Sequence, residues 1–285
     1  MKFLGFNIGE KPHLENAFCD FHVHTTFSDG LLTPEQVTEI AKEKGLAALG
    51  IADHDAVGGI EPAIKKGKQI GVEILPAVEL SCIVGDCDIH ILGYYVDYKN
   101  KKLIAILEDI QSKRMERAKK MVEKLADQGA EVELARVLEL AGNGTVGRPH
   151  IAQALLEQGH ISSYDEAFWK YIGYHCPAYV PKEKLTPRQA IEMIRQFHGI
   201  PILAHPMSYN NRAIVNFIID EGIAGLEIWR PDHSENDMKY LNALVTNNHL
   251  LATGGTDCHG GRKGKILIGE IKVPYEYVTA LKNAR

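Results

Sequence analysis

Near the start of the chain, one stretch reads Asp20-Phe21-His22-Val23-His24-Thr25-Thr26-Phe27-Ser28-Asp29-Gly30. Its first five residues alternate between polar and apolar types, and a period of two predicts a β-strand. Asp20, His22 and His24 would then project from one face of that strand. Burying such groups is costly unless an opposite charge or a metal cation pairs with them. The stretch therefore predicts a metal-binding strand, with a solvent-facing polar strand as the alternative.

The rest of the chain alternates between short apolar runs and helical patterns. The runs that predict strands lie at 18–24, 46–52, 72–80, 89–96, 200–204, 225–229 and 250–256. Thr33-Pro34 and Thr186-Pro187 each place a capping residue before a proline at the first helical position, which predicts two helix starts. Alternating strands and helices of this kind predict an α/β fold with a mostly parallel sheet, and about seven such strands suggest a barrel.

This alternation stops between about residues 101 and 180, where the pattern is helical. Leu103, Leu107 and Ile110 recur at helical spacing. We expect a barrel formed by residues 1–100 and 178–285, with a small helical cap inserted at 101–177. The basic residues between Lys113 and Lys120 are expected to form a solvated helix face, with RNA contact as the less favoured alternative.

Composition excludes several classes of protein. A hydrophobic content of 45% with 24% charged residues is that of an ordinary globular protein. The net charge of −5 argues against a broad surface for nucleic acid, but leaves room for a local basic pocket for a phosphorylated molecule. We find no apolar run of membrane-spanning length and no signal-peptide pattern. The five cysteines form no CxxC pair, so we expect reduced thiols and a cytoplasmic protein.

Residues that can bind metals recur near the ends of the predicted strands. They are His22, His24, Asp29, Asp53, His54, Glu79, His90, His205, Asp257 and His259. The C-terminal strand ends of a barrel meet at one face, where barrel enzymes carry their chemistry. Because one metal takes three or four protein ligands, so large a set suggests two or three ions. Each residue alone could be a cap, a turn or a core histidine, but these explanations would have to hold independently for all of them.

The donor types narrow the metal and the reaction. Imidazoles together with carboxylates suit Zn, Mn or Fe better than Ca or Mg. Clustered cations of this kind suit the hydrolysis of phosphate esters. Cys258 lies beside the predicted site, and we interpret it as a small packing residue rather than a nucleophile.

These motifs resemble those of the PHP (polymerase and histidinol phosphatase) superfamily of metal-dependent phosphoesterases, over residues 18–96 and 177–261. The matching strings are Asp20-x-His22-x-His24-x-x-x-Ser28-Asp29-Gly30, Asp53-His54-Asp55, His205-Pro206 and Gly255-x-Asp257-x-His259-Gly260. The resemblance implies a distorted barrel of seven βα units with a three-metal site. The chain departs from the usual pattern at Ala52, Thr256 and Cys258, which leaves the metal ligands intact but could reshape the pocket wall.

The resemblance also implies how the ligands divide among three divalent ions (Mn, Fe or Zn). The first ion would be held by His22, His24, Glu79 and Asp257, the second by Glu79, His90 and His205, and the third by Asp29, His54 and His259. Besides Asp257, the catalytic set would include Asp20 and Asp53, placed behind the ligands to orient the imidazoles.

Strings in the insertion resemble a subgroup that includes nucleoside 3′,5′-bisphosphate phosphatases and 5′-3′ exoribonucleases acting on short RNA. They are Gly147-Arg148-Pro149-His150-Ile151-Ala152, Ala167-Phe168-Trp169-Lys170-Tyr171-Ile172-Gly173 and Pro177-Ala178-Tyr179-Val180-Pro181. This implies removal of the 3′-phosphate from a bisphosphate such as pAp by a metal-bridging hydroxide. Arg148 would clamp phosphate and Lys170 would add a charge, unless both are surface residues.

Three other functions stay open at this point: a 5′-3′ exoribonuclease on short RNA, a histidinol-phosphate phosphatase, and a non-catalytic module stabilised by metal. The expected partner is a phosphorylated nucleotide or short RNA, and no membrane. The sequence leaves the oligomeric state and the general acid open.

Overall fold

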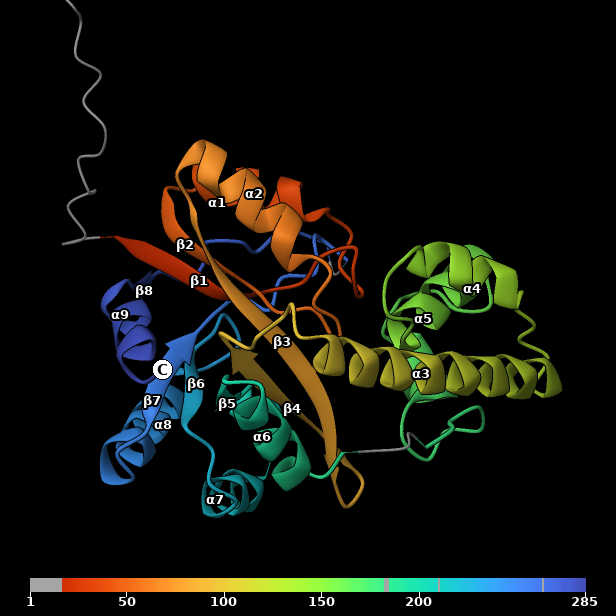
Figure 1. Ribbon diagram of the computed structural model, residues 1–285. Coiled ribbons are helices and arrows are strands. Elements are labelled where there is room, and N and C mark those ends of the chain that lie inside the picture. Colours follow the sequence, from red (N-terminus) through yellow and green to blue (C-terminus); the bar gives the residue numbers. More distant parts are fainter. Residues whose placement is uncertain (1–16, 182–184, 210, 263) are drawn as a thin grey trace, which may run out of the picture.

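A single curved sheet forms the centre of the molecule (Figure 1). The computed structural model describes residues 17–181, 185–209, 211–262 and 264–285. Its strands are β1 (Phe18–Val23), β2 (Leu46–Ile51), β3 (Glu73–Val84), β4 (Cys87–Tyr94), β5 (Ile200–Leu203), β6 (Gly225–Trp229), β7 (Leu251–Gly254) and β8 (Val273–Pro274). They are ordered β7-β6-β5-β4-β3-β2-β1-β8 in the sheet.

The sheet curls until β1 meets the residues that follow β7. The backbone N–H of His24 donates to the carbonyl of Cys258 at 3.0 Å, and that of Asp257 donates to the carbonyl of His22 at 2.8 Å. Gly255 permits this approach, because a Cβ placed there would lie 2.6 Å from the backbone nitrogen of His22. These contacts nearly close the sheet into the predicted α/β barrel, which the structure confirms.

Helices cover the outside of the barrel. They are α1 (Pro34–Glu43), α2 (Ile60–Ile70), α6 (Pro187–Gln196), α7 (Arg212–Asp220), α8 (Glu235–Asn247) and α9 (Glu276–Asn283), with a short 3₁₀ helix, η2 (Pro206–Tyr209). Thr33 and Thr186 cap α1 and α6 as expected, each accepting the backbone N–H of the glutamine three residues later.

β4 departs from the expected parallel order. It pairs antiparallel with both β3 and β5, whereas β1–β2–β3 and β5–β6–β7 are parallel. The reason is the short connection: Val84 pairs with Cys87 across a two-residue turn, and a parallel crossover needs a dozen residues or more. Because β4 runs backwards, its first half lies at the barrel end where the other strands finish. His90 therefore reaches that end from inside a strand.

The insertion consists of α3 (Lys101–Asp127), α4 (Leu134–Ala141), α5 (Arg148–Glu157) and the π-helix η1 (Phe168–Ile172). In Figure 1, α4 and α5 lie to one side of the barrel, and α3 extends towards them. Leu103 and Leu107 of α3 are buried in the barrel core, while Met121 and Leu125 of the same helix are buried with α4 and α5. One helix therefore links two apolar cores, and the predicted bounds of the cap, 101–177, stay a prediction.

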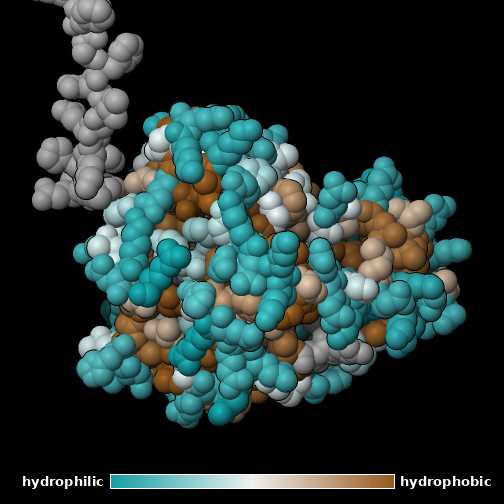
Figure 2. All heavy atoms as spheres, viewed as in Figure 1, coloured by the Kyte–Doolittle hydropathy of each residue, from teal (hydrophilic) through white to brown (hydrophobic). Residues whose placement is uncertain are grey.

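The surface in Figure 2 is mostly hydrophilic, with small apolar areas between the charged side chains. Within the described ranges, no helix is at once long enough and apolar enough to cross a membrane.

Candidate metal centre

The predicted metal ligands converge at one end of the barrel. They come from β1 and the loop after it, from the ends of β2 and β5, from within β3 and β4, and from the segment after β7: His22, His24, Asp29, His54, Glu79, His90, His205, Asp257 and His259. His205 and Asp257 have left-handed backbone, with φ of 31° and 53°. Such backbone is strained outside glycine and is concentrated at functional sites.

The first group of ligand atoms is formed by His22, His24, Glu79 and Asp257, whose ligand atoms all lie within 4.8 Å of one another. The Nε2 atoms of His22 and His24 lie 3.3 and 3.2 Å from Oε2 of Glu79. They lie 3.4 and 3.0 Å from Oδ1 of Asp257. This is the set predicted for the first ion.

Glu79 also belongs to a second group. Its Oε1 lies 3.0 Å from Nδ1 of His90 and 3.2 Å from Nε2 of His205. These two nitrogens are 3.0 Å apart, so the predicted second set lies together. His54 also approaches, with Nδ1 3.0 Å from Oε2 of Glu79. His54 therefore contacts Glu79 of the second set, although it was predicted for the third set alone.

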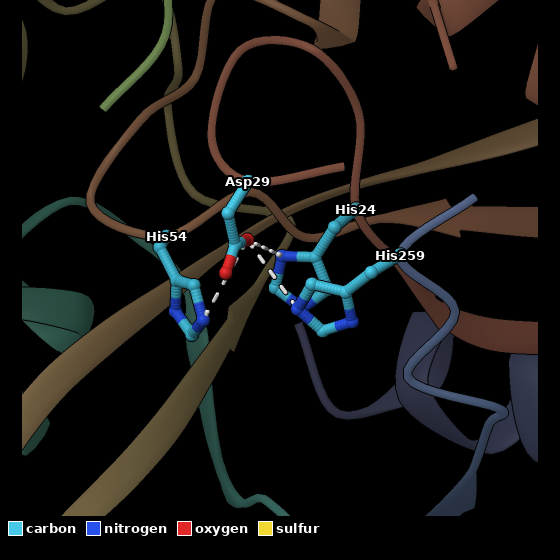
Figure 3. Close-up of side chains that lie close together, drawn as sticks. All are labelled: His24, Asp29, His54 and His259. Carbon is cyan, nitrogen blue, oxygen red and sulfur yellow. Dashed lines mark ion pairs between the residues drawn. The ribbon is translucent and has the colours of Figure 1, made fainter. Parts of the chain in front are cut away.

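The third group surrounds Asp29 (Figure 3). Oδ1 of Asp29 lies 3.3 Å from Nε2 of His259, 3.8 Å from Nδ1 of His24 and 4.0 Å from Nε2 of His54. All four side chains point to the same space, although they come from three separate parts of the chain.

Three buried atoms in these groups make ion-pair contacts but no hydrogen bond within the described residues: Asp29 Oδ1, His54 Nδ1 and Glu79 Oε2. A buried polar atom left unsatisfied costs about 1–3 kcal/mol. A divalent cation would satisfy all three atoms, and imidazole with carboxylate is the donor set that transition metals bind. The residues present therefore fit a metal site.

Comparison with known proteins agrees with this geometry. Residues 20–174 match the sequence model of the PHP domain. This chain belongs to the PHP family. It is 34% identical to the 5′-3′ exoribonuclease Rnm of Escherichia coli K12, over 84% of each chain. It is 30% identical to a 3′,5′-nucleoside bisphosphate phosphatase of Chromobacterium violaceum, over 87% of this chain and 89% of the relative.

A solved structure shares the whole architecture of this PHP protein. It is an amidohydrolase from Chromobacterium violaceum with bound sulfate, which superposes with a TM-score of 0.85 at 27% identity and covers 94% of this chain and 96% of its own. With the family established, the chain is a metal-dependent phosphoesterase.

In this PHP site, outward hydrogen bonds hold four imidazoles by Nδ1. The partners of His22, His24, His205 and His259 are, in turn, Glu227 Oε1 at 3.1 Å, Ser28 Oγ at 3.3 Å, Ser208 Oγ at 2.9 Å and the carbonyl of Asp257 at 2.7 Å. Ser28 and Ser208 donate their own protons elsewhere, to Asp53 and to the carbonyl of His205, so each hydroxyl accepts from its imidazole. The Nδ1 atoms therefore carry the protons, and Nε2 is left as the metal ligand.

Asp20 and Asp53 lie behind the ligands, and among the described residues neither makes a hydrogen bond to an imidazole ring. Asp20 accepts the N–H and the hydroxyl of Thr256 at 2.9 and 2.7 Å, so it holds the segment that leads to Asp257. Asp53 accepts the N–H of Thr25 at 2.7 Å and the hydroxyl of Ser28 at 2.6 Å, and Ser28 in turn lies 3.3 Å from Nδ1 of His24. Burial raises the pKa of Asp20 to about 6.

Glu227 and Arg230 also contact the site, but the sequence motifs do not identify them. Glu227 is fully buried in β6, and its Oε2 accepts from the backbone of His205 at 2.8 Å and from Arg230 Nη1 at 3.0 Å. Nη2 of Arg230 reaches Oδ2 of Asp257 at 3.4 Å. The available signal was a lone carboxylate in the middle of the apolar strand Gly225–Trp229.

Charges in the site shift one another's pKa. Burial alone would raise the pKa of Glu79 and Asp257, but the imidazoles around them lower it well below the usual value. Burial would lower the pKa of His22, but Glu79, Asp257 and Glu227 raise it to about 10. Without a cation, protonated imidazole therefore balances the buried carboxylates, and a metal would replace those protons.

Two cavities border the ligand groups. The larger, of about 440 Å³, is lined by Asp29, Asp257 and His259 of the site, by Arg230, and by Tyr164 and Phe168 of the insertion. The smaller, of about 130 Å³, is lined by His54 and His90 together with Arg114, Arg117 and Arg148. The insertion thus provides part of the wall of both cavities.

Two arginines of α3 depart from the solvated face expected at 113–120, whereas Lys113, Lys119 and Lys120 are exposed as expected. Arg114 is bound by Asp55 and by Ser81 at 2.7 Å each. Arg117 is only 8% exposed and donates through Nε to the carbonyl of Val180 at 2.7 Å. Its Nη2 is buried without a hydrogen bond among the described residues.

The two substrate residues predicted in the insertion differ in placement. Arg148 lines the smaller cavity, held by Asp88 at 2.8 Å and lying over the ring of Phe168. Lys170 pairs with Glu166 at 3.2 Å on an exposed face, and lines neither of these cavities. Arg148 therefore lies in a cavity beside the ligand groups and Lys170 does not, while substrate binding by either residue stays a prediction.

Proposed function

We propose that this PHP enzyme removes the 3′-phosphate of nucleoside 3′,5′-bisphosphates such as pAp. The observation that supports this most is that the ligand groups border two cavities at once. One has the size of a small-molecule site, for which roughly 300–1,000 Å³ is usual, at about 440 Å³. The other is lined by three guanidinium groups. A compact substrate with more than one phosphate suits such a pair of cavities.

We infer that the site holds three divalent cations of Mn, Fe or Zn. His22, His24, Glu79 and Asp257 would hold the first, Glu79, His90 and His205 the second, and Asp29, His54 and His259 the third, with His54 near enough to share the second. When bound, the cations supply Lewis-acid stabilisation of the phosphoryl oxygens and activation of water.

The arginines of the smaller cavity would bind phosphate. The planar guanidinium group of Arg148 can donate two parallel hydrogen bonds to a phosphate. Arg117 has a buried guanidinium nitrogen that no described group satisfies, and burial together with Arg148 lowers its pKa to about 10. A phosphate anion between these two side chains would accept a hydrogen bond from the unsatisfied nitrogen of Arg117 and offset the repulsion between the two positive charges.

The base of the nucleotide would lie in the larger cavity. Tyr164 and Phe168 line this cavity, and their ring centroids are 5.6 Å apart. Aromatic side chains stack on any nucleobase because every base has a π-face. The same residues belong to the insertion, so they would also exclude water from the reacting phosphate.

The test is a side-by-side assay of the metal-loaded enzyme. After reconstitution with Mn²⁺ or Zn²⁺, the substrates would be pAp, AMP, histidinol phosphate and a short 5′-phosphorylated RNA. We expect pAp to be converted fastest, with AMP and inorganic phosphate as products. Preference for histidinol phosphate, or metal binding without turnover of any substrate, would contradict the proposal.

A second candidate is a 5′-3′ exoribonuclease acting on short RNA with the same metals. It is favoured by the 34% identity to the exoribonuclease of Escherichia coli K12. In that case the terminal nucleotide would occupy the larger cavity, with Arg262 and Lys265 in its wall available to the following phosphates. A ladder of products differing by one mononucleotide, formed faster than AMP from pAp, would select this function.

A further inference from the structure

Glu227 is a buried carboxylate that belongs to none of the three ligand groups. Its side chain has no exposed surface. Oε1 lies 3.1 Å from Nδ1 of His22, and Oε2 accepts from the backbone of His205 at 2.8 Å and from Arg230 at 3.0 Å. One carboxylate therefore touches one member of the first group and one member of the second.

The bond to His22 decides which nitrogen of that imidazole is free. A carboxylate only accepts, so Nδ1 of His22 must carry the proton in this contact. Nε2 is then left with its lone pair, and it is Nε2 that lies 3.3 Å from Glu79 and 3.1 Å from Nε2 of His24. The opposite tautomer would place a proton where the metal is expected.

The bond to His205 acts on the backbone rather than on the ring. His205 has a φ of 31°, in the left-handed region that is unfavourable for a residue with a side chain. The hydrogen bond from its N–H to Glu227 holds this strained residue at the end of β5. Arg230 meanwhile offsets the charge of Glu227 and extends the network to Asp257.

We propose that Glu227 is a positioning residue that fixes His22 in the metal-binding tautomer, holds the backbone of His205, and thereby sets the affinity of the first two ligand groups for divalent cations. The inference rests on the proposed metal site, but not on the identity of the substrate. It predicts a defect in metal binding itself, before any chemistry.

The change E227Q tests this role because it preserves the shape of the side chain, replaces one acceptor oxygen by a donating NH₂ group and removes the negative charge. All three groups around Glu227 are donors: Nδ1–H of His22, N–H of His205 and the guanidinium of Arg230. Glutamine has one amide oxygen, so its NH₂ must face a donor in either orientation. Where the NH₂ group faces His22, the clash between two donors is relieved if the proton of His22 moves from Nδ1 to Nε2. A proton on Nε2 blocks metal binding there.

The measurement is metal affinity, by competition of the full-length protein with a chromophoric chelator for Zn²⁺ and Mn²⁺. Loss of a residue that hydrogen-bonds a metal ligand typically weakens metal binding by about 10–100-fold. We expect the Zn²⁺ affinity of E227Q to be lower than that of the wild type by a factor in that range. The matched control is E73Q, since Glu73 is also on a strand but pairs with Tyr275 and Lys282. E73Q should bind Zn²⁺ as the wild type does.

A second readout uses the wild-type protein and so does not depend on whether E227Q folds. In the Zn²⁺-loaded enzyme, the ¹⁵N resonances of His22 should show a protonated Nδ1 and a metal-bound Nε2. A metal-bound Nδ1 would overturn the proposal. It would also be overturned if E227Q lowered the melting temperature while its folded fraction bound Zn²⁺ with unchanged affinity. Tight metal binding without hydrolysis of pAp would contradict the proposed substrate and leave this inference standing.

Discussion

The Nε2 atoms of His22 and His24 lie 3.1 Å apart inside the barrel, with neither side chain exposed. Nδ1 of each ring is held by an acceptor on the other side, Glu227 for one and Ser28 for the other. Two lone pairs facing each other across such a gap repel unless a proton or a cation lies between them. This pair therefore defines the place where the site is built to receive a metal.

Removing a ligand from that place should abolish turnover without unfolding the protein. For H22A and for D257A we expect kcat/KM on the best substrate to fall by more than about 100-fold, since even outer-shell partners are worth about 10–100-fold. Circular dichroism and the metal content of the purified variants would be measured beside activity. Either variant retaining the wild-type rate with a full complement of metal would show that the ligand assignment is wrong.

Arg148 and Lys170 should respond differently to truncation. A hydrogen bond to a charged group is worth about 1.5–3 kcal/mol, so R148A should lower kcat/KM for a phosphorylated nucleotide by roughly 10–100-fold. Lys170 is half-exposed and paired with Glu166, so K170A should stay within about twofold, as expected for an exposed ion pair. Steady-state kinetics of both variants decides the matter, and equal losses would contradict the placement of Lys170 outside the site.

Metal binding should release protons. The carboxylates around His22 raise its pKa to about 10, so at pH 7.5 the metal-free ring is protonated and must lose a proton to bind a cation. Calorimetric titration with Zn²⁺ in two buffers of different ionisation enthalpy measures the number released. We expect at least one proton per protein and a smaller number above pH 10. An apparent enthalpy independent of the buffer would contradict this balance.

His150 should make stability depend on pH. Burial lowers its pKa from 6.5 to about 4, and its neutral Nδ1 accepts the N–H of Gly147 at 3.1 Å at the start of α5. The stabilisation is complete above pH 6.5 and is lost as the pH falls towards 4, which between pH 7.5 and 4.5 amounts to about 2–3 kcal/mol from this group.

The variant H150Q separates this effect from general acid unfolding. Glutamine at the third position of a helix can also accept the N–H of the capping residue. Urea unfolding at pH 7.5 and 4.5 should therefore show a smaller loss of stability in H150Q than in the wild type. Equal losses in the two proteins would mean that His150 is not the titrating group.

The candidate metal ligands and most of the strands could be predicted from the sequence. Each ligand follows or interrupts a short apolar run, and such runs are typical of buried strands. The direction of β4 was not predictable in the same way, since it depends on a two-residue turn at Gly85 and Asp86 between two apolar runs. Its consequence is that His90 reaches the site from within a strand.

Residues that act through other residues were harder to find. Glu227 is a single carboxylate within an apolar strand, and nothing local indicates that it faces His22. Arg114 and Arg117 have the spacing of a polar helix face, and only the folded structure shows that Asp55 and Ser81 bind Arg114 and that Val180 binds the buried Arg117. These contacts are between residues far apart in the chain, so a local pattern does not record them.

Under the proposed function, the metal-loaded enzyme cleaves the 3′-phosphate of a nucleoside 3′,5′-bisphosphate. The most direct measurement is ³¹P NMR of pAp during turnover, which resolves the 3′-phosphate, the 5′-phosphate and inorganic phosphate. We expect the 3′ signal to disappear, inorganic phosphate to grow in equal amount and 5′-AMP to accumulate. Loss of the 5′ signal with accumulation of 3′-AMP, or no change in pAp while short RNA is degraded, would contradict it.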